Sequence, residues 1–165
     1  MRPELDTIDR QILAILQSDA SLTAADIATR VGLSQSPCWR RIARLERLGM
    51  IRRRVALLDR ERLGLGVLVF VQVKYARGAR QSLAEFEETI RGFPEVQECY
   101  MLMGDIDFLL KVVTRDVAAY EQFLREKLSR IPSVQEVRSN IALTPVKDST
   151  ELPLELVAVE SPRDG

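Results

Sequence analysis

Histidine is absent from the 165-residue sequence, which also has only two cysteines and one tryptophan. Without histidine, the chain lacks the commonest general base and the commonest side-chain metal ligand. Cys38 and Cys99 lie far apart and lack metal-ligand spacing, so we interpret both as free thiols in a reducing compartment. There is also no phosphate loop and no nucleophile beside a base. These absences argue against an enzyme and predict no catalytic residues, no metal site and no cofactor.

Long apolar runs are missing too. No run reaches the roughly 18 residues that a membrane-spanning helix needs, and the polar, acidic start at Met1–Asp6 lacks the apolar core of a secretory signal. The composition, 46% hydrophobic and 29% charged, is that of a globular protein. We therefore expect a cytoplasmic protein with no membrane partner, long enough for one ordinary domain or two small ones.

Charge balances over the whole chain but is unevenly placed. Residues 1–66 hold twelve arginines against eight acidic residues, a net charge of +4, and residues 67–165 carry the compensating −4. The excess is concentrated in residues 30–54, where eight arginines stand against Glu46 alone. A local basic segment is typical of a module that binds nucleic-acid phosphates, whereas the acidic half is not expected to contact DNA.

Two helices are predicted at the start of the chain. Apolar residues recur at helical spacing over residues 6–18. Thr23 and Asp26 have the spacing of a capping box, in which each side chain accepts a hydrogen bond from a free backbone N–H at a helix start. Gly32 can adopt the left-handed conformation that ends a helix. The second helix is therefore expected between Thr23 and Gly32.

A third helix is expected from Ser34 or Ser36 to Gly49. Together with the helix before it, the segment Ala24–Ile42 has the length of a helix-turn-helix, and the third helix would be its recognition helix. The residues predicted to bind double-stranded DNA are polar, aromatic or basic side chains of this helix and its cap. They are Ser34, Gln35, Ser36, Trp39, Arg40, Arg41 and Arg44.

Other interpretations of this segment stay open. The arginines could coat the solvated face of an ordinary three-helix bundle, although such faces normally mix both signs of charge. Trp39 could pack instead of contacting DNA, and Cys38 is expected in the core. Met50–Asp59 has the composition of a strand, whose arginines either form a wing along the DNA backbone or are solvated.

The remainder of the chain alternates between strand and helix patterns. Val67–Tyr75 shows a period of two, which is typical of a strand. Further strands are predicted over 96–103, 107–114 and 134–143, with helices over 80–92 and 116–130. The order βαββαβ is that of a ferredoxin-like domain. Helices on one face leave the other sheet face open with apolar residues on it, so we expect a homodimer through this domain.

The predicted fold class is therefore α+β, a winged helix-turn-helix followed by a ferredoxin-like ligand-binding domain. We place the DNA-binding domain and its following strand in residues 1–58 and a hinge in 59–66. The ferredoxin-like domain, for effector binding and oligomerisation, occupies 67–146, and the C-terminal tail occupies 147–165.

In combination, these segments resemble the Lrp/AsnC family of feast/famine transcription regulators over about residues 5–155. The resemblance rests on LDTIDRQIL at 5–13, VGLSQSPCWRRIARLERLGMI at 31–51, VALLD at 55–59 and PEVQECYMLMGDIDFLLKV at 94–112, and on the IPSVQEVRSNIAL and VKDSTELPL segments that follow. It implies a C-terminal domain that binds a small amino acid, dimers that assemble into octamers, and assembly or DNA affinity that responds to the ligand. The PCWRR segment is similar to a branch that responds to cysteine or to other sulfur-containing or apolar amino acids.

The family's effector region corresponds here to the turn between the second and third strands. Asp105 and Asp107 would accept from the ligand's ammonium group, and backbone N–H groups near Gly104 would donate to its carboxylate. A side-chain pocket would be lined by Tyr100, Leu102 and Met103. The alternative is that Gly104 and Asp105 are present only because the turn requires them.

Three other functions are alternatives to a ligand-gated regulator. An architectural DNA-binding protein would use the same arginines with little sequence preference and no amino-acid effector. A stand-alone amino-acid-binding module would not need the arginines at all. Enzymes also use ferredoxin-like domains, but the sequence offers no catalytic constellation.

Overall fold

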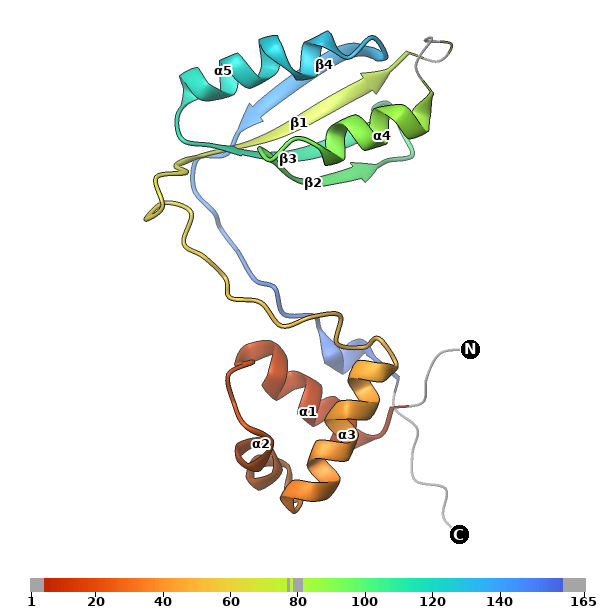
Figure 1. Ribbon diagram of the computed structural model, residues 1–165, viewed down its shortest axis with the longest axis vertical. Helices are drawn as coiled ribbons and strands as arrows, with labels where there is room; N and C mark the ends of the chain where they lie inside the picture. Colours follow the sequence, from red (N-terminus) through yellow and green to blue (C-terminus); the bar gives the residue numbers. More distant parts are fainter. Residues whose placement is uncertain (1–4, 77, 79–81, 159–165) are drawn as a thin grey trace. The chain divides into compact units, whose positions relative to one another are not determined.

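The computed structural model describes residues 5–76, 78 and 82–158. The chain divides into two compact units, one made of Met1–Leu57 with Lys147–Gly165 and the other of Leu58–Val146. Figure 1 shows the helices of the first unit and the sheet with its helices in the second.

The first unit contains α1 (Thr7–Ser18), α2 (Ala24–Val31) and α3 (Gln35–Arg47). The capping box predicted for α2 is confirmed, since the Thr23 side chain accepts from the Asp26 N–H and the Asp26 side chain accepts from the Thr23 N–H. The left-handed Gly32 ends this helix with φ of 70°.

Both α1 and α3 begin within the predicted ranges. Asp6 caps α1 through a second capping box with Asp9. Ser34 is the N-cap residue of α3, and its side chain makes no capping hydrogen bond. The three helices predicted from apolar spacing and cap residues are thus present.

One apolar cluster holds the three helices together. Its buried members are Leu5, Ile12, Leu16, Ile27, Ala28, Cys38, Ile42 and Leu45. Cys38 is completely buried, as predicted, and both cysteines are free. Each fully buried aliphatic side chain of this cluster favours the packing of the three helices by roughly 1.5–3 kcal/mol.

The segment after α3 differs from the prediction. Residues 52–58 are exposed and form no strand in the part of the chain that the structure describes. A strand needs a hydrogen-bonded neighbour, and strand-like composition supplies none. The predicted strand over Met50–Asp59 is therefore wrong for the single chain. The side chains of Val55 and Leu57 are 56% and 73% exposed, so this segment packs on nothing among the described residues that would pair with it.

The C-terminal arm, Lys147 onward, is grouped with the helical unit. It is anchored on α1 by Gln17, whose side-chain Nε2 donates to the Leu152 carbonyl at 3.1 Å and whose Oε1 accepts from the Leu152 N–H at 3.0 Å. A short 3₁₀ helix, Leu154–Leu156, follows. Side-chain to backbone hydrogen bonds at Leu152 therefore hold the described part of the arm, residues 147–158, on α1.

The second unit is a four-stranded sheet covered by two helices. Its strands are β1 (Val67–Tyr75), β2 (Val96–Met101), β3 (Phe108–Thr114) and β4 (Val134–Ile141), and its helices are α4 (Leu83–Arg91) and α5 (Val117–Glu126). The strand order is β2-β3-β1-β4 and every neighbouring pair is antiparallel. This confirms the βαββαβ order. The predicted beginning of the first helix at residue 80 lies outside the described residues.

The core of this unit lies between the helices and one face of the sheet. Val69, Val71 and Val73 of β1 are completely buried and share a cluster with Phe86 of α4 and Phe123 of α5. The opposite face carries Leu68, Phe70, Gln72 and Lys74 of β1, as the period of two predicts. Of these, Phe70 is 39% exposed.

Candidate DNA interface and ligand pocket

The first turns of α3 present an exposed polar and basic surface. Among the predicted DNA-binding residues, Ser34, Gln35, Ser36, Trp39 and Arg40 are all exposed. Trp39 is 61% exposed, so it does not pack into the core. The uncapped N-terminus of α3 also offers backbone N–H groups, which favour anions. These groups lie where a recognition helix contacts base edges and phosphates.

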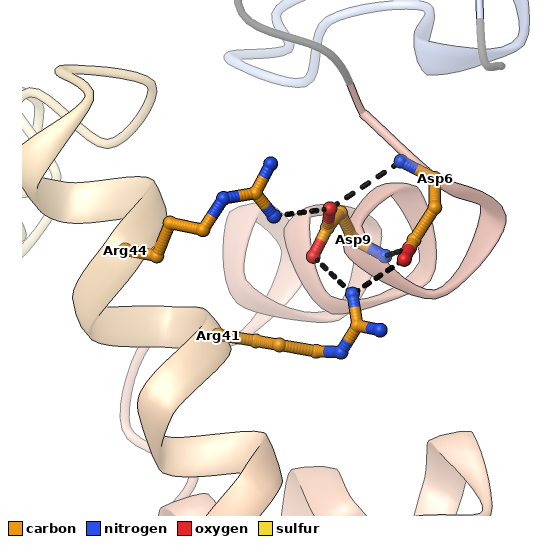
Figure 2. A network of polar contacts seen from close by, with 4 residues as sticks. All are labelled: Asp6, Asp9, Arg41 and Arg44. Atoms are coloured by element: carbon orange, nitrogen blue, oxygen red, sulfur yellow. Dashed lines mark hydrogen bonds and ion pairs between the residues drawn. The ribbon is translucent and has the colours of Figure 1, made fainter.

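Arg41 and Arg44, predicted to contact DNA, have carboxylate partners within the unit (Figure 2). Arg41 Nη1 lies 2.8 Å from Asp9 Oδ1 and 2.6 Å from Asp6 Oδ2, and Arg44 Nη1 lies 2.9 Å from Asp9 Oδ2. The Asp9 side chain is only 1% exposed. Partial burial opposes ionisation of Asp6, but the hydrogen bonds from the Asp9 N–H and from Arg41 hold the pKa of Asp6 below its ordinary value.

Several other arginines of the basic segment lie at the surface. One of them, Arg54, forms an exposed ion pair with Glu46 at 3.0 Å. No carboxylate of the described residues forms an ion pair with Arg40, Arg47 or Arg52. The positive charge counted in the sequence is thus partly neutralised, and what remains is carried by exposed side chains.

A cavity of about 270 Å³ lies at one end of the open sheet face. It is lined by Gln72, Lys74, Asp105, Ile106, Glu136 and Arg138, which come from β1, the β2–β3 turn and β4. Arg138 Nε lies 2.6 Å from Glu136 Oε1. The cavity therefore brings two basic and two acidic groups together, a set that matches the ammonium and carboxylate groups of an amino acid.

Of the predicted effector residues, only Asp105 lines this cavity. Asp107 instead supports the backbone, because its Oδ2 accepts from the Tyr75 N–H at 2.8 Å and its own N–H donates to the Val73 carbonyl at 3.1 Å. Gly104 shapes the turn with φ of 152°.

The residues predicted to line a side-chain pocket lie at the surface in the part of the chain that the structure describes. Tyr100, Leu102 and Met103 are exposed, and none of them lines the cavity around Asp105. The Tyr100 hydroxyl donates to Glu98 Oε2 at 2.6 Å. This hydrogen bond, followed by that from Lys111, holds the pKa of Glu98 below its ordinary value.

Sequence reasoning missed Lys74, Glu136 and Arg138 as candidate ligand residues. Part of the signal was available, since Gln72 and Lys74 alternate with apolar residues at the end of β1. Their meeting with Asp105 depends on the register, in which Lys74 pairs with Glu136 and Gln72 with Arg138. A linear pattern does not contain that pairing.

Comparisons with known proteins agree with both halves of the chain. A model of the winged helix-turn-helix DNA-binding domain matches residues 5–52, and a model of the Lrp/AsnC ligand binding domain matches residues 68–152. The chain belongs to the Lrp/AsnC family. The Leucine-responsive regulatory protein of Klebsiella pneumoniae is 40% identical over 149 residues, which are 90% of this chain and 91% of that protein.

Solved structures show the same architecture. An AsnC family transcriptional regulator from Agrobacterium tumefaciens has a TM-score of 0.87 and 45% identity, covering 93% of this chain and all of that one. A Neisseria meningitidis transcriptional regulator, solved as a complex with L-Met, has a TM-score of 0.88 and 37% identity, covering 92% and 97%. The resemblance and the fold class predicted from the sequence are thereby confirmed, as are DNA and amino-acid binding at family level.

Among the residues that the structure describes, no helix is long and apolar enough to cross a membrane. In the same residues, no three histidine, cysteine, aspartate or glutamate side chains come together in a group that could hold a metal ion.

Proposed function

We propose that this Lrp/AsnC protein is a transcription regulator that binds double-stranded DNA through α3 and binds a small amino acid in the cavity around Asp105. The observation that carries the ligand proposal is the meeting of Lys74 and Arg138 with Asp105 and Glu136 in one cavity of about 270 Å³. The Neisseria meningitidis relative, whose structure is a complex with L-Met, supports an amino acid as the ligand class.

The charges of the cavity suggest how the ligand is held. Asp105 is exposed at the turn and accepts from the ammonium group, with Glu136 as a second acceptor. Lys74 and Arg138 donate to the carboxylate, and charge-assisted hydrogen bonds of this kind are the strong ones. Ile106 is the apolar residue of the cavity lining, and it would contact the ligand's side chain.

The DNA interface is proposed on the exposed part of α3. Ser34, Gln35 and Ser36 lie at the N-terminal end, which reaches base edges when a recognition helix enters the major groove. Arg40 contacts a phosphate or guanine, and Trp39 covers the adjoining backbone. The twofold symmetry of a dimer would then predict a pseudo-palindromic operator with half-sites about one helical turn, or a multiple of it, apart.

A homodimer through the open sheet face is also proposed. Leu68 and Phe70 of β1 and Leu109 of β3 lie on this face, where they are only partly covered. Exposed apolar faces of this kind normally mark an interaction surface, and a second copy of the sheet would cover this one. Assembly of such dimers into octamers is the further step that the family resemblance implies.

The ligand proposal is tested with a thermal-shift panel of the twenty amino acids on the full chain. A ligand at about 100 times its dissociation constant stabilises the folded state by roughly 2.7 kcal/mol, which raises Tm by several degrees. Asp105→Ala should abolish the shift of any hit, whereas Glu121→Ala, which removes an exposed acid from α5, should leave it unchanged. A flat panel for the wild-type protein would contradict the ligand proposal and favour an architectural DNA-binding protein.

Specific recognition of DNA is tested separately. The affinity for an operator selected from random duplexes is compared with that for unrelated duplex DNA at one fixed salt concentration. A gene regulator should show a ratio of about 10³ or more. A ratio near one would again favour the architectural function, independently of the amino-acid result.

A further inference from the structure

We propose that Asp9 is a positioning residue for DNA binding, which holds the recognition helix through Arg41 and Arg44. These two arginines then form ion pairs with the buried Asp9 and do not contact phosphate. The inference rests on the DNA interface proposed for α3, but it changes the role that the sequence suggested for two of its seven residues.

The geometry is a carboxylate of α1 shared by two guanidinium groups of α3. Figure 2 shows both arginine side chains reaching from α3 to the first turn of α1. Each Asp9 oxygen accepts from a different arginine, at 2.8 Å for Arg41 and 2.9 Å for Arg44. Oδ2 of Asp9 also accepts from the Asp6 N–H at 3.3 Å. Asp9 thus joins the start of α1 to two successive turns of α3.

Burial makes this arrangement hard to exchange. The Asp9 side chain is 1% exposed, and a buried carboxylate without its partners is strongly unfavourable. An arginine that left Asp9 for a DNA phosphate would exchange one anion for another and leave the buried carboxylate with one charged partner in place of two. Arg41 has a second anchor in Asp6 at 2.6 Å. A contact of either arginine with phosphate would therefore add little to the free energy of DNA binding.

The position of the pair on α3 explains what it does. Cys38, Ile42 and Leu45 face the core, and Arg40 and Arg47 are exposed. Arg41 and Arg44 lie between these two stripes and are only partly exposed. Hydrogen bonds from this flank to a fixed carboxylate set the rotation of α3 about its own axis. They thereby orient Arg40 and the helix N-terminus toward the DNA.

The salt dependence of DNA binding distinguishes positioning from contact, because log K falls with log salt by about 0.9 for each phosphate neutralised. The probe is a 40-base-pair duplex of mixed sequence, titrated with the full chain at several salt concentrations and at a temperature where circular dichroism shows each variant folded. Arg40→Ala should make the slope shallower by about one. Arg41→Ala and Arg44→Ala should leave the slope unchanged, because neither side chain contacts phosphate. They should lower Tm and also lower the ratio of operator to unrelated-DNA affinity, because α3 is no longer held at its rotation.

In Asp9→Asn the slope of log K against log salt should change in the opposite direction to that in Arg40→Ala. Asp9→Asn removes the negative charge that both guanidinium groups share, although Arg41 keeps its ion pair with Asp6 at 2.6 Å. The slope should therefore become steeper by up to about one while Tm falls. A double-mutant cycle of Asp9→Asn with Arg41→Ala should show that the two Tm losses are not additive.

Two results would overturn the proposal. One is a slope that becomes shallower by about one in Arg41→Ala or Arg44→Ala, which would make that arginine a phosphate contact. The other is additive Tm losses in the cycle. If Asp9→Asn does not fold, the two arginine variants decide alone. An unchanged slope in Arg40→Ala would instead contradict the DNA interface on α3 at that residue, which is a separate outcome.

Discussion

The backbone N–H of Tyr75 donates a hydrogen bond to Oδ2 of Asp107 at 2.8 Å. Tyr75 is the last residue of β1, and the pairing of β1 with β3 ends at Val73 and Phe108. The carboxylate of Asp107, one residue before β3, therefore continues the hydrogen bonding on this side of β1. Asp105 and Asp107, equivalent in the sequence pattern, thus have different surroundings, and only Asp105 lines the cavity.

Asp107→Ala is therefore expected to destabilise the second unit without removing a ligand contact. Loss of the acceptor removes a partly buried hydrogen bond from the Tyr75 N–H, at a cost of about 0.5–1.5 kcal/mol. Asp107→Asn keeps an acceptor oxygen and should lose less than half of that. Chemical denaturation of the three proteins measures the difference. Equal free energies of unfolding for wild type and Asp107→Ala would show that the hydrogen bond is unimportant.

Gly104 is expected to be needed for its backbone conformation. Its φ of 152° is one that residues with a side chain rarely adopt, although a Cβ would meet no atom within 4 Å. Gly104→Ala should cost about 1–3 kcal/mol in strain. Gly66→Ala is the control, because its Cβ would make only an ordinary contact, 3.7 Å from the Arg115 carbonyl. Thermal melting of both variants tests this, and equal losses at the two positions would exclude strain as the cause.

The helices and strands were largely predictable because their signals are local. The capping box of Thr23 and the alternation along β1 lie within a few residues of chain. The partners of Arg41 and Arg44 could not be predicted in this way. Asp9 is more than thirty residues away in the sequence, and only the packing of α1 on α3 brings it near. The same holds for Arg138 in the cavity.

The wrong strand over residues 50–59 has the same origin. Composition indicates how well a segment would fit a sheet, but pairing depends on a neighbouring strand. Nothing in the local pattern says whether that neighbour exists within the chain.

Acid should remove part of the stability of the helical unit through Asp6. Burial disfavours its charge, but the hydrogen bonds from Asp9 and Arg41 prevail and lower its pKa. The folded-state pKa therefore lies below the unfolded value of about 3.9. The contribution is complete above that value and is lost as pH falls through the lower folded pKa.

Asp6→Asn isolates this contribution, because asparagine also caps helices but does not ionise. The difference in Tm between wild type and Asp6→Asn should stay constant from pH 7 to 5 and shrink below about pH 4. Melting curves across this range measure it. A difference that grew on acidification would mean that the charged form of Asp6 is the unfavourable one.

The arm that follows β4 should be released when Gln17 is replaced. Gln17→Ala removes both hydrogen bonds to Leu152, which together contribute about 1–2 kcal/mol at an exposed site. Hydrogen exchange at the Leu152 amide should become faster, while exchange in β1 should not change. Gln11→Ala, at an exposed position of the same helix, is the control. Unaltered exchange at Leu152 in Gln17→Ala would show that other contacts hold the arm.

Phe70 is expected to lie at the centre of the proposed dimer interface. It is 39% exposed on the open face of the sheet, and Phe70→Glu would place a charge where two apolar faces meet. Desolvating that charge without a partner is unfavourable, so the variant should sediment at the mass of a single chain while the wild type sediments as a dimer or a multiple of it. Leu83→Glu is the matched control, since Leu83 is 41% exposed but lies on α4, which packs on the other face. Sedimentation equilibrium over a range of concentrations separates the cases. If Phe70→Glu kept the wild-type mass and Leu83→Glu lost it, the helical face and not the open sheet would be the interface.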